Sequence, residues 1–305
     1  MKRVNKLFVF MMVLAGITGL KNPASGQGFK SMKQSEDTLA AILSEMNKAG
    51  SDSLNEILNQ RFSRDLFSAL LMPASDSYTF ESIKTLIKVA PDDNKFRIYH
   101  WNLPSGNGKK RCYGYIKLLN RKNPVVITLH DFSDSISSPE TAILEPGHWF
   151  GALYYTVISC ENEQGGKFYT LLGWAGNNAT ITQKVIEIIY FDDKDLPHFG
   201  LPVFPDYEKG SMTRVIFRYA ATTSMSLKYE EQITSTRRKW NVRSRVFDTI
   251  SERGLMIVGD HLIPLDPQLE GQYQYYVPAG EVCDGFQFVK GNWHFVKGLE
   301  TRNKH

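Results

Sequence analysis

Histidine and aspartate stand side by side at two places where a strand is predicted to end. His130-Asp131 and Asp260-His261 each combine a general base with a carboxylate that could orient it. Neighbouring residues of a strand point to opposite faces of the sheet, however, so we do not expect either pair to act as a unit. His148 and His198 lie in stretches with Gly and Pro, where we expect loop or surface histidines.

An acidic cluster, Asp192-Asp193-Lys194-Asp195, offers the oxygen ligands that calcium prefers. Calcium needs about six or more oxygens, and this cluster contains a lysine and lacks the glycine and distal glutamate of an EF-hand. We therefore interpret it as a solvated turn. The sequence predicts no metal site and no cofactor.

The chain contains no catalytic motif of the common kinds. It has no Gly-x-Ser-x-Gly elbow, no His-Glu-x-x-His helix, no phosphate-binding glycine loop and no Cys-x-x-Cys pair. We predict no catalytic residue. A hydrolase such as a glycosidase stays open, because its two carboxylates need only converge in space from distant strands.

Aromatic residues are the remaining candidates for ligand contacts, since their rings can stack on sugar rings or on apolar groups of a partner. We select Trp101, Trp149 and Trp174 as candidate ligand-binding residues. The alternative is core packing, because large aromatics in strands more often form core or cross-strand pairs.

Residues 1–26 have the composition of a secretory signal peptide. They begin with basic residues, continue with an apolar run over 7–20 and end in small residues before Gln27. The run has about 14 residues, whereas a membrane-spanning helix needs about 20. No cysteine lies at the expected cleavage point, so a lipid anchor is not indicated. We predict a periplasmic or secreted protein that does not span a membrane.

The formal charge of +4 belongs to this leader. Residues 1–26 hold four basic residues and no acidic residue, so the rest of the chain balances 32 basic against 32 acidic residues. A near-neutral protein has no overall field that would attract nucleic acid. Five cations at 237–245 surround Trp240. We expect a solvated loop between strands there, and the alternative is a patch for an anionic glycan, lipid or partner.

Three cysteines, Cys112, Cys160 and Cys283, are too few for a disulfide scaffold. One pair could be linked in an oxidising compartment. Cys160 lies in an apolar strand, so we expect it to be a buried free thiol.

Apolar spacing divides the chain after the leader into two regions. Residues 27–95 are predicted to form a helical segment, with one helix from Ser35, a second that is capped by Asp52 or Ser53 and ends at Pro73, and a third over about 80–89. Such short amphipathic helices must pack on each other or on the sheet that follows.

Residues 96–298 are predicted to form an antiparallel β domain, followed by a polar tail at 299–305. Hairpins are expected around 104–110, around 251–254 and at Gly291-Asn292. Residues 184–191 fit a helix or a strand, and their β-branched side chains favour a strand. A strand is also expected over 273–277.

The segment 149–178 organises this domain as two aromatic strands at the centre of a sheet. Both faces of the first strand are apolar, so we expect an interior strand. One face is predicted to hold Phe150, Ala152, Tyr154, Ile158 and Cys160, and the other Leu153, Tyr155 and Val157.

Whole segments of the β domain have a recognisable character. They are FRIYHWNLPSG from Phe96, LLGWAGNNATITQKVIEIIYF over 171–191, SMSLKYEE over 224–231, MIVGDHLIPLDPQLEGQYQYYVP over 256–278 and DGFQFVKGNWHFV over 284–296. Together they resemble an uncharacterised family of exported proteins from Bacteroidetes-type bacteria. The resemblance implies an envelope or extracellular location and supplies no functional residue.

The sequence thus predicts an α+β protein, predominantly antiparallel β, with N-terminal helices packed on a large curled sheet or on an incomplete propeller-like β domain. We expect a non-catalytic binding or structural component of a bacterial envelope, with a glycan or a protein as partner and no nucleic acid. The alternative is a secreted hydrolase acting on glycans through carboxylates that the sequence does not reveal. An assembly subunit is a third hypothesis.

Overall fold

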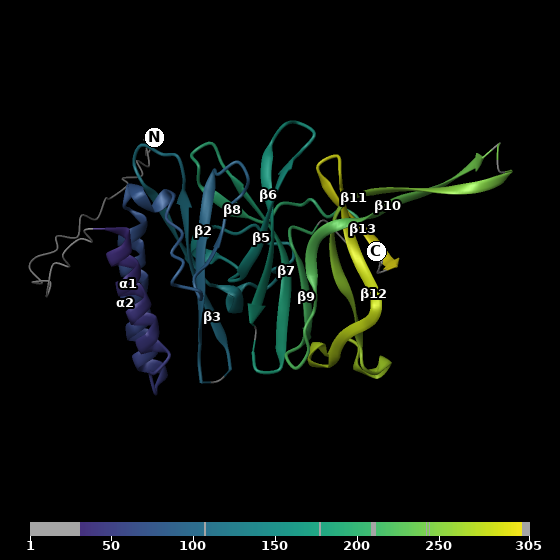
Figure 1. Ribbon diagram of the computed structural model, residues 1–305. Coiled ribbons are helices and arrows are strands. Elements are labelled where there is room, and N and C mark those ends of the chain that lie inside the picture. The colour runs from purple at the N-terminus through teal and green to yellow at the C-terminus, as the bar shows by residue number, and fades with distance from the viewer. Residues whose placement is uncertain are drawn as a thin grey trace, which may run out of the picture.

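Two N-terminal helices are followed by three antiparallel sheets stacked face to face in the computed structural model (Figure 1). The structure describes residues 31–106, 108–176, 178–208, 212–241, 243 and 245–300. The predicted signal peptide and residues 301–305 of the predicted tail lie outside the described residues. The prediction of a mostly antiparallel β protein with N-terminal helices is confirmed.

Each sheet consists of consecutive strands. The helices are α1 (Met32–Met46) and α2 (Asp52–Leu70). The first sheet has, in order, β1 (Ile87–Val89), β2 (Phe96–Pro104), β3 (Lys110–Leu118) and β4 (Val125–His130). The second has β5 (Leu153–Glu161), β6 (Lys167–Gly176) and β7 (Ile181–Phe191), with β8 (Pro197–Phe199) and β9 (Val215–Ala220) both paired to β7. The third has β10 (Leu227–Asn241), β11 (Val246–Pro264), β12 (Tyr276–Val289) and β13 (Asn292–Glu300).

Both helices are capped by a serine that precedes the predicted start: α1 begins after Ser31 rather than at Ser35, and α2 after Ser51 rather than after Asp52 or Ser53. The hydroxyls of Ser31 and Ser51 each accept a hydrogen bond from a backbone amide three residues later. α2 ends shortly before Pro73, as predicted. The two helices cover the outer face of the first sheet, where Phe62 packs edge-on against Trp101 with ring centroids 5.1 Å apart.

The predicted third helix over 80–89 is wrong. Phe80 has a φ of +49°, which a helix does not tolerate, and residues 87–89 form β1 instead. Phe80, Ile83 and Leu86 are buried at spacings of three, which produced the helical pattern, but they reach the core from successive turns.

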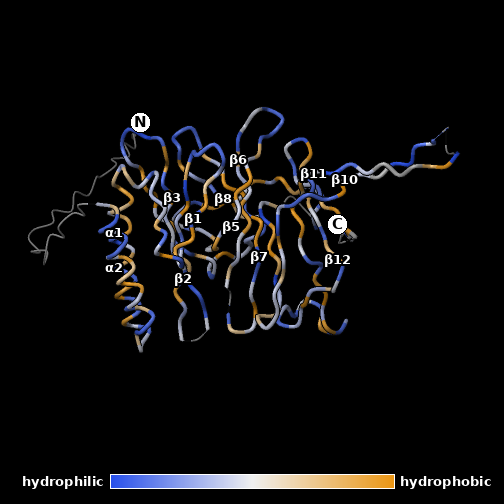
Figure 2. The backbone as a smooth tube through the Cα atoms, in the orientation of Figure 1, coloured by the Kyte–Doolittle hydropathy of each residue, from blue (hydrophilic) through white to orange (hydrophobic). Residues whose placement is uncertain are grey.

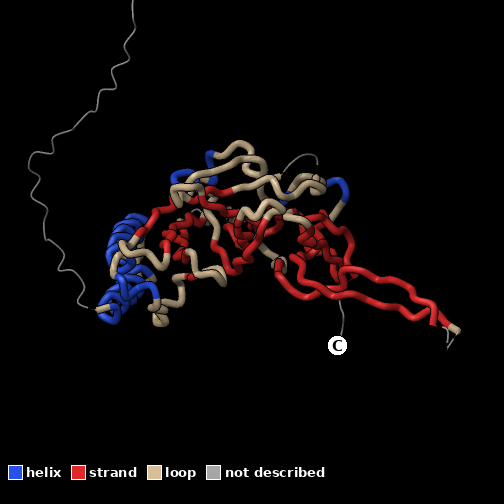
Figure 3. The backbone as a smooth tube through the Cα atoms, turned by 90° about the horizontal axis from the view of Figure 1, so that it is seen from above, coloured by secondary structure: helices blue, strands red, loops and turns tan. Residues whose placement is uncertain are grey.

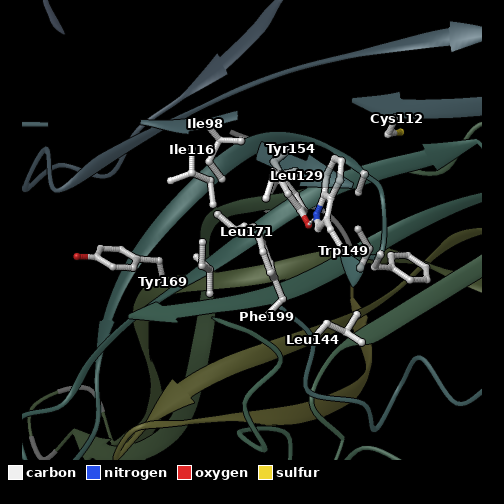
Figure 4. Packing of buried hydrophobic residues seen from close by; sticks show 14 of the residues in the cluster. Ile98, Cys112, Ile116, Leu129, Leu144, Trp149, Tyr154, Tyr169, Leu171 and Phe199 are labelled. Atoms are coloured by element: carbon white, nitrogen blue, oxygen red, sulfur yellow. Dashed lines mark hydrogen bonds between the residues drawn. The ribbon is translucent and has the colours of Figure 1, made fainter. Parts of the chain in front are cut away.

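Facing apolar side chains fill the space between the first and second sheets (Figure 4). Ile98 and Ile116 point to this layer from the first sheet and Leu171 from the second, and all three are fully buried. The Trp149 indole donates a 2.8 Å hydrogen bond to the Tyr154 hydroxyl beside it. Both polar groups are thereby satisfied inside the core.

A second apolar layer lies between the second and third sheets, with Ile186, Ile257 and Phe286 at its centre. The fully buried Trp293 donates a 2.9 Å hydrogen bond to the Thr170 hydroxyl across this layer. The described sheets therefore pack like blades of the expected incomplete propeller, and the stack stays open (Figure 3). Hydrophilic residues gather at the turns (Figure 2).

The first strand of the central hairpin differs from its prediction. β5 begins at Leu153 rather than Trp149, and it is an edge strand of the described sheet, while β6 is the interior one. A β-bulge after Tyr154 shifts the alternation. Tyr154 consequently faces the first sheet, whereas Ile158 and Cys160 face the third, so the expected common face is wrong.

β10 and β11 form a longer hairpin than predicted. β11 runs uninterrupted through 251–254, so the turn expected there is wrong, and the cations Arg237 to Lys239 lie in β10 rather than in a loop. Before Met256, β11 pairs with β10 alone. This two-stranded ribbon, the described residues of 233–254, is hereafter the arm, and it projects from the stack (Figures 1 and 3).

The C-terminal hairpin agrees closely with its prediction. Its two-residue loop is Lys290-Gly291, one residue before the expected position, and both have positive φ, +49° and +81°, as a type I′ turn requires. β13 continues to Glu300, beyond the expected end at 298. Residues 273–275 form a 3₁₀ turn instead of the start of a strand.

All three cysteines are buried free thiols, which confirms the expectation for Cys160. Burial raises the pKa of the Cys160 and Cys283 thiols to about 11. Such thiols are poor nucleophiles at neutral pH.

Candidate functional site

The three tryptophans selected as ligand-binding candidates lie in different environments. Trp101 is 2% exposed and donates a 2.7 Å hydrogen bond to the Asn59 side chain. Trp149 is fully buried between the first two sheets. Both belong to the core, as the alternative interpretation holds, and no ligand can stack on them. Trp174, near the end of β6, is half-buried and lines a pocket.

This pocket, hereafter the Trp174 pocket, has a volume of about 290 Å³. Its lining residues come from the β2–β3 turn, the β6–β7 turn and the β9–β10 connection, among other places. These three connections lie at the same end of the stack (Figure 1). None of its described lining residues is acidic. Its polar lining includes Lys110, Asn178, Thr182, Lys184 and Tyr219.

Two lysines line the pocket together with the tryptophan. The Lys110 ammonium lies 4.7 Å from the centre of the Trp174 ring. Lys184 is directly opposite Trp174 in the β6–β7 ladder, so both side chains leave the same face of the sheet. The Lys184 ammonium lies 4.4 Å from the centre of the Tyr155 ring and donates a 3.3 Å hydrogen bond to its hydroxyl.

These lysines have no negative partner among the described residues. Burial lowers the pKa of Lys184, because the charged form loses water and no carboxylate replaces it. Lys110 is exposed and contacts the indole instead of an acid. Two uncompensated ammonium groups at one pocket attract an anion.

A third feature of the pocket is the Thr182 hydroxyl. Thr182 is 8% exposed and lies opposite Tyr219 in the β7–β9 ladder. Burial raises the pKa of the Tyr219 hydroxyl, and a hydrogen bond with the Thr182 side chain lowers it. The two hydroxyls therefore add a polar wall to the pocket.

The combination defines what the pocket can bind. Ammonium groups hold carboxylate, phosphate or sulfate, a half-exposed indole stacks on the apolar face of a sugar ring, and amide and hydroxyl groups bind ring hydroxyls. The described lining contains no nucleophile beside a general base. The geometry is that of a binding site for a small anionic molecule with an apolar face.

A second pocket, of about 410 Å³, lies between β9 and the third sheet. His261 Nδ1 is 2.6 Å from the Asp284 carboxylate in its lining. The neighbouring Asp260 instead accepts a hydrogen bond from the Ser226 amide, so the adjacent pair Asp260-His261 is split, as the alternation of strand faces predicts.

The other sequence candidates have structural contacts. Asp131 accepts hydrogen bonds from two backbone amides, while His130 is exposed. Asp192 accepts from two amides of its own turn and lies 3.5 Å from His198. His148 packs edge-on against the Phe132 ring. No three His, Cys, Asp or Glu residues of the described chain are grouped as metal ligands.

Sequence analysis missed three residues of the Trp174 pocket. Lys184 shares a strand face with the buried Ile186 and Ile188, so a lysine at an apolar position was a signal that could have been found. Lys110 and Thr182 gave no such signal. Thr182 faces the pocket from β7, the neighbour of β6 in the same sheet, whereas Lys110 reaches Trp174 only because the first and second sheets end side by side.

Comparison of the chain with protein-family models, with curated proteins and with solved structures finds no match. The resemblance to exported bacterial proteins therefore stays a prediction. Neither helix in the described part of the chain is long and apolar enough to cross a membrane.

Proposed function

We propose that this protein is an exported, non-catalytic binding protein of a bacterial envelope whose ligand is an anionic sugar held in the Trp174 pocket. The observation that carries the proposal is that two lysines without acidic partners among the described residues, Lys110 and Lys184, line one pocket with a half-exposed indole that Lys110 contacts. The Thr182 and Tyr219 hydroxyls in the lining support it, because such groups can also bind the hydroxyls of a sugar.

The size of the pocket sets the size of the ligand. A volume of about 290 Å³ is at the low end for ligand sites, so it accommodates one sugar ring with its charged group. The remainder of a longer glycan would extend into solvent or toward the adjoining groove that shares Lys110 and Gly176.

Isothermal titration calorimetry tests this with matched pairs of probes: galacturonate against galactose, and glucose 6-phosphate against glucose. We expect the anionic member of at least one pair to bind and its neutral partner to bind at least roughly tenfold more weakly, since each charge-assisted contact contributes about 1.5–3 kcal/mol. Neutral and anionic sugars binding equally would refute the proposal.

Variants locate the binding site. Lys184→Gln and Trp174→Ala should each weaken binding of the anionic probe about tenfold or more. Lys122→Gln removes an exposed lysine from the β3–β4 turn and serves as the matched control. If Lys122→Gln weakens binding as much as Lys184→Gln, the Trp174 pocket is not the site.

The hydrolase alternative rests on a different observation, the His261–Asp284 contact in the second pocket. An imidazole whose Nδ1 is held by a carboxylate can use Nε2 for proton transfer. Release of reducing ends from acidic oligosaccharides, lost in His261→Gln and retained in His130→Gln, would favour that alternative. Absence of release by the native chain would remove it.

A further inference from the structure

The arm presents apolar side chains to solvent far from the body of the protein. Trp240 of β10 and Phe247 of β11 are directly opposite, with ring centroids 5.0 Å apart, and are 48% and 60% exposed. Val246, on the other face of the ribbon, is 54% exposed. Such a two-stranded ribbon is only marginally stable in water, so exposed aromatic residues on it indicate a binding partner.

The arm is also the most basic part of the chain. Residues 237–247 contain five cations and no acidic residue. Of these cations, only Arg237 has an ion-pair partner among the described residues, Glu252 at 3.8 Å. Without the predicted leader and residues 233–254, the chain has 26 basic and 30 acidic residues. The protein is therefore polarised, with a cationic arm on an acidic body.

We propose that the arm docks on an anionic phospholipid surface. Trp and Phe favour the region between headgroups and acyl chains, and Arg and Lys beside them bind the lipid phosphates.

A nucleic acid would also attract the cations and stack on the rings, but the exposed Val246 matches acyl chains better than bases. The acidic body is repelled from the same surface, so the arm holds the body away from the membrane with the Trp174 pocket open to solvent. Docking does not depend on what that pocket binds.

Co-sedimentation of the chain 27–305 with vesicles tests the proposal, using phosphatidylcholine vesicles with and without phosphatidylglycerol. Binding is expected only with phosphatidylglycerol and should weaken as salt is raised. Trp240 is the most exposed tryptophan of the described chain, so binding should shift tryptophan fluorescence to the blue, and Trp240→Phe should abolish that shift while leaving vesicle binding largely intact.

Two double variants and two matched controls assign the effect to the arm. Trp240→Ala/Phe247→Ala and Arg238→Gln/Lys239→Gln should each lower vesicle affinity roughly tenfold or more. The controls remove exposed residues of the same kinds from α2: Leu54→Ala/Ile57→Ala and Arg61→Gln/Arg64→Gln. Circular dichroism should show that all four variants stay folded, because none replaces a buried side chain.

Several results would overturn the proposal. They are equal binding to neutral and anionic vesicles, equal losses in the α2 controls, absence of vesicle binding, and binding of the arm to DNA or heparin without binding to vesicles. Because the sugar titrations and the vesicle assay use different variants, either proposal can fail without the other.

Discussion

His100 is a buried residue that joins the first sheet to the second. Its Nε2 accepts a 2.7 Å hydrogen bond from the Tyr154 amide at the edge of β5, and its Nδ1 lies 3.0 Å from the Ile87 carbonyl oxygen. These contacts require the neutral imidazole with the proton on Nδ1. Burial lowers the pKa of His100 to about 4.

This lowered pKa predicts acid sensitivity. Between about pH 6.5 and pH 4 the unfolded chain binds a proton at this histidine and the folded chain does not, so stability is lost as pH falls through that window. The full loss is about 3 kcal/mol. Urea unfolding from pH 7 to pH 4 measures it. His100→Gln should make the free energy of unfolding less dependent on pH, and the exposed-site control His130→Gln should leave this dependence unchanged. If the free energy of unfolding falls equally with pH in the native protein and in His100→Gln, the account is contradicted.

Arg214 and Glu187 form a fully buried ion pair, with Nε and Oε2 2.8 Å apart. Arg214 also donates to the carbonyl oxygens of Pro139, Ala142 and Phe199, so it ties a loop to β7 and β8 of the second sheet. Arg214→Ala leaves a buried carboxylate unpaired and should lower the free energy of unfolding by about 3–5 kcal/mol. Arg214→Met/Glu187→Gln, measured beside it by urea unfolding, should recover more than half of that loss. If the double variant recovers none of the lost free energy of unfolding, the loss comes from the hydrogen bonds of Arg214 to the carbonyl oxygens and not from the ion pair.

At the scale of elements, turns of neighbouring sheets touch. Gly291, in the β12–β13 turn, has a φ of +81°, and a Cβ there would lie 2.9 Å from the Asn162 backbone of the β5–β6 turn. Gly280 has a similar φ of +73° with open space around it. Gly280→Ala should lower stability by about 1–2 kcal/mol from backbone strain alone. Gly291→Ala should lower stability by clearly more. If thermal unfolding shows equal losses of stability in the two variants, the two turns are not in close contact.

The elements also show which structural features can be predicted from the sequence. β4, β7 and the β12–β13 loop follow from alternation and turn chemistry, which are local. The bulge after Tyr154 and the uninterrupted β11 do not, because a bulge and a strand through Ser251 to Gly254 are set by the partner strand. The same limit applies to the candidate site. Trp174 was found from its residue type, whereas Lys110 reaches it only through the stacking of two sheets.

Across the whole molecule, the stack predicts a gradient of local stability. β7 is hydrogen-bonded on both sides and its faces meet both apolar layers, whereas the arm is two strands in solvent. Native-state hydrogen exchange should find the slowest amides in β7 and fast amides in the arm. Vesicles containing phosphatidylglycerol should slow exchange in the arm alone. Protection of the arm equal to that of β7 in free protein would contradict this view of the ribbon.

The central claim is that the Trp174 pocket binds an anionic sugar, and the indole N–H signals of the five tryptophans test it most directly. In ¹⁵N spectra, with the Trp174 signal assigned from Trp174→Phe, titration with galacturonate or glucose 6-phosphate should move that signal to saturation. The signals of the buried Trp101, Trp149 and Trp293 should stay in place, and galactose or glucose should have little effect. A Trp174 signal that does not respond to either anion, or that responds equally to the neutral sugars, would contradict the account.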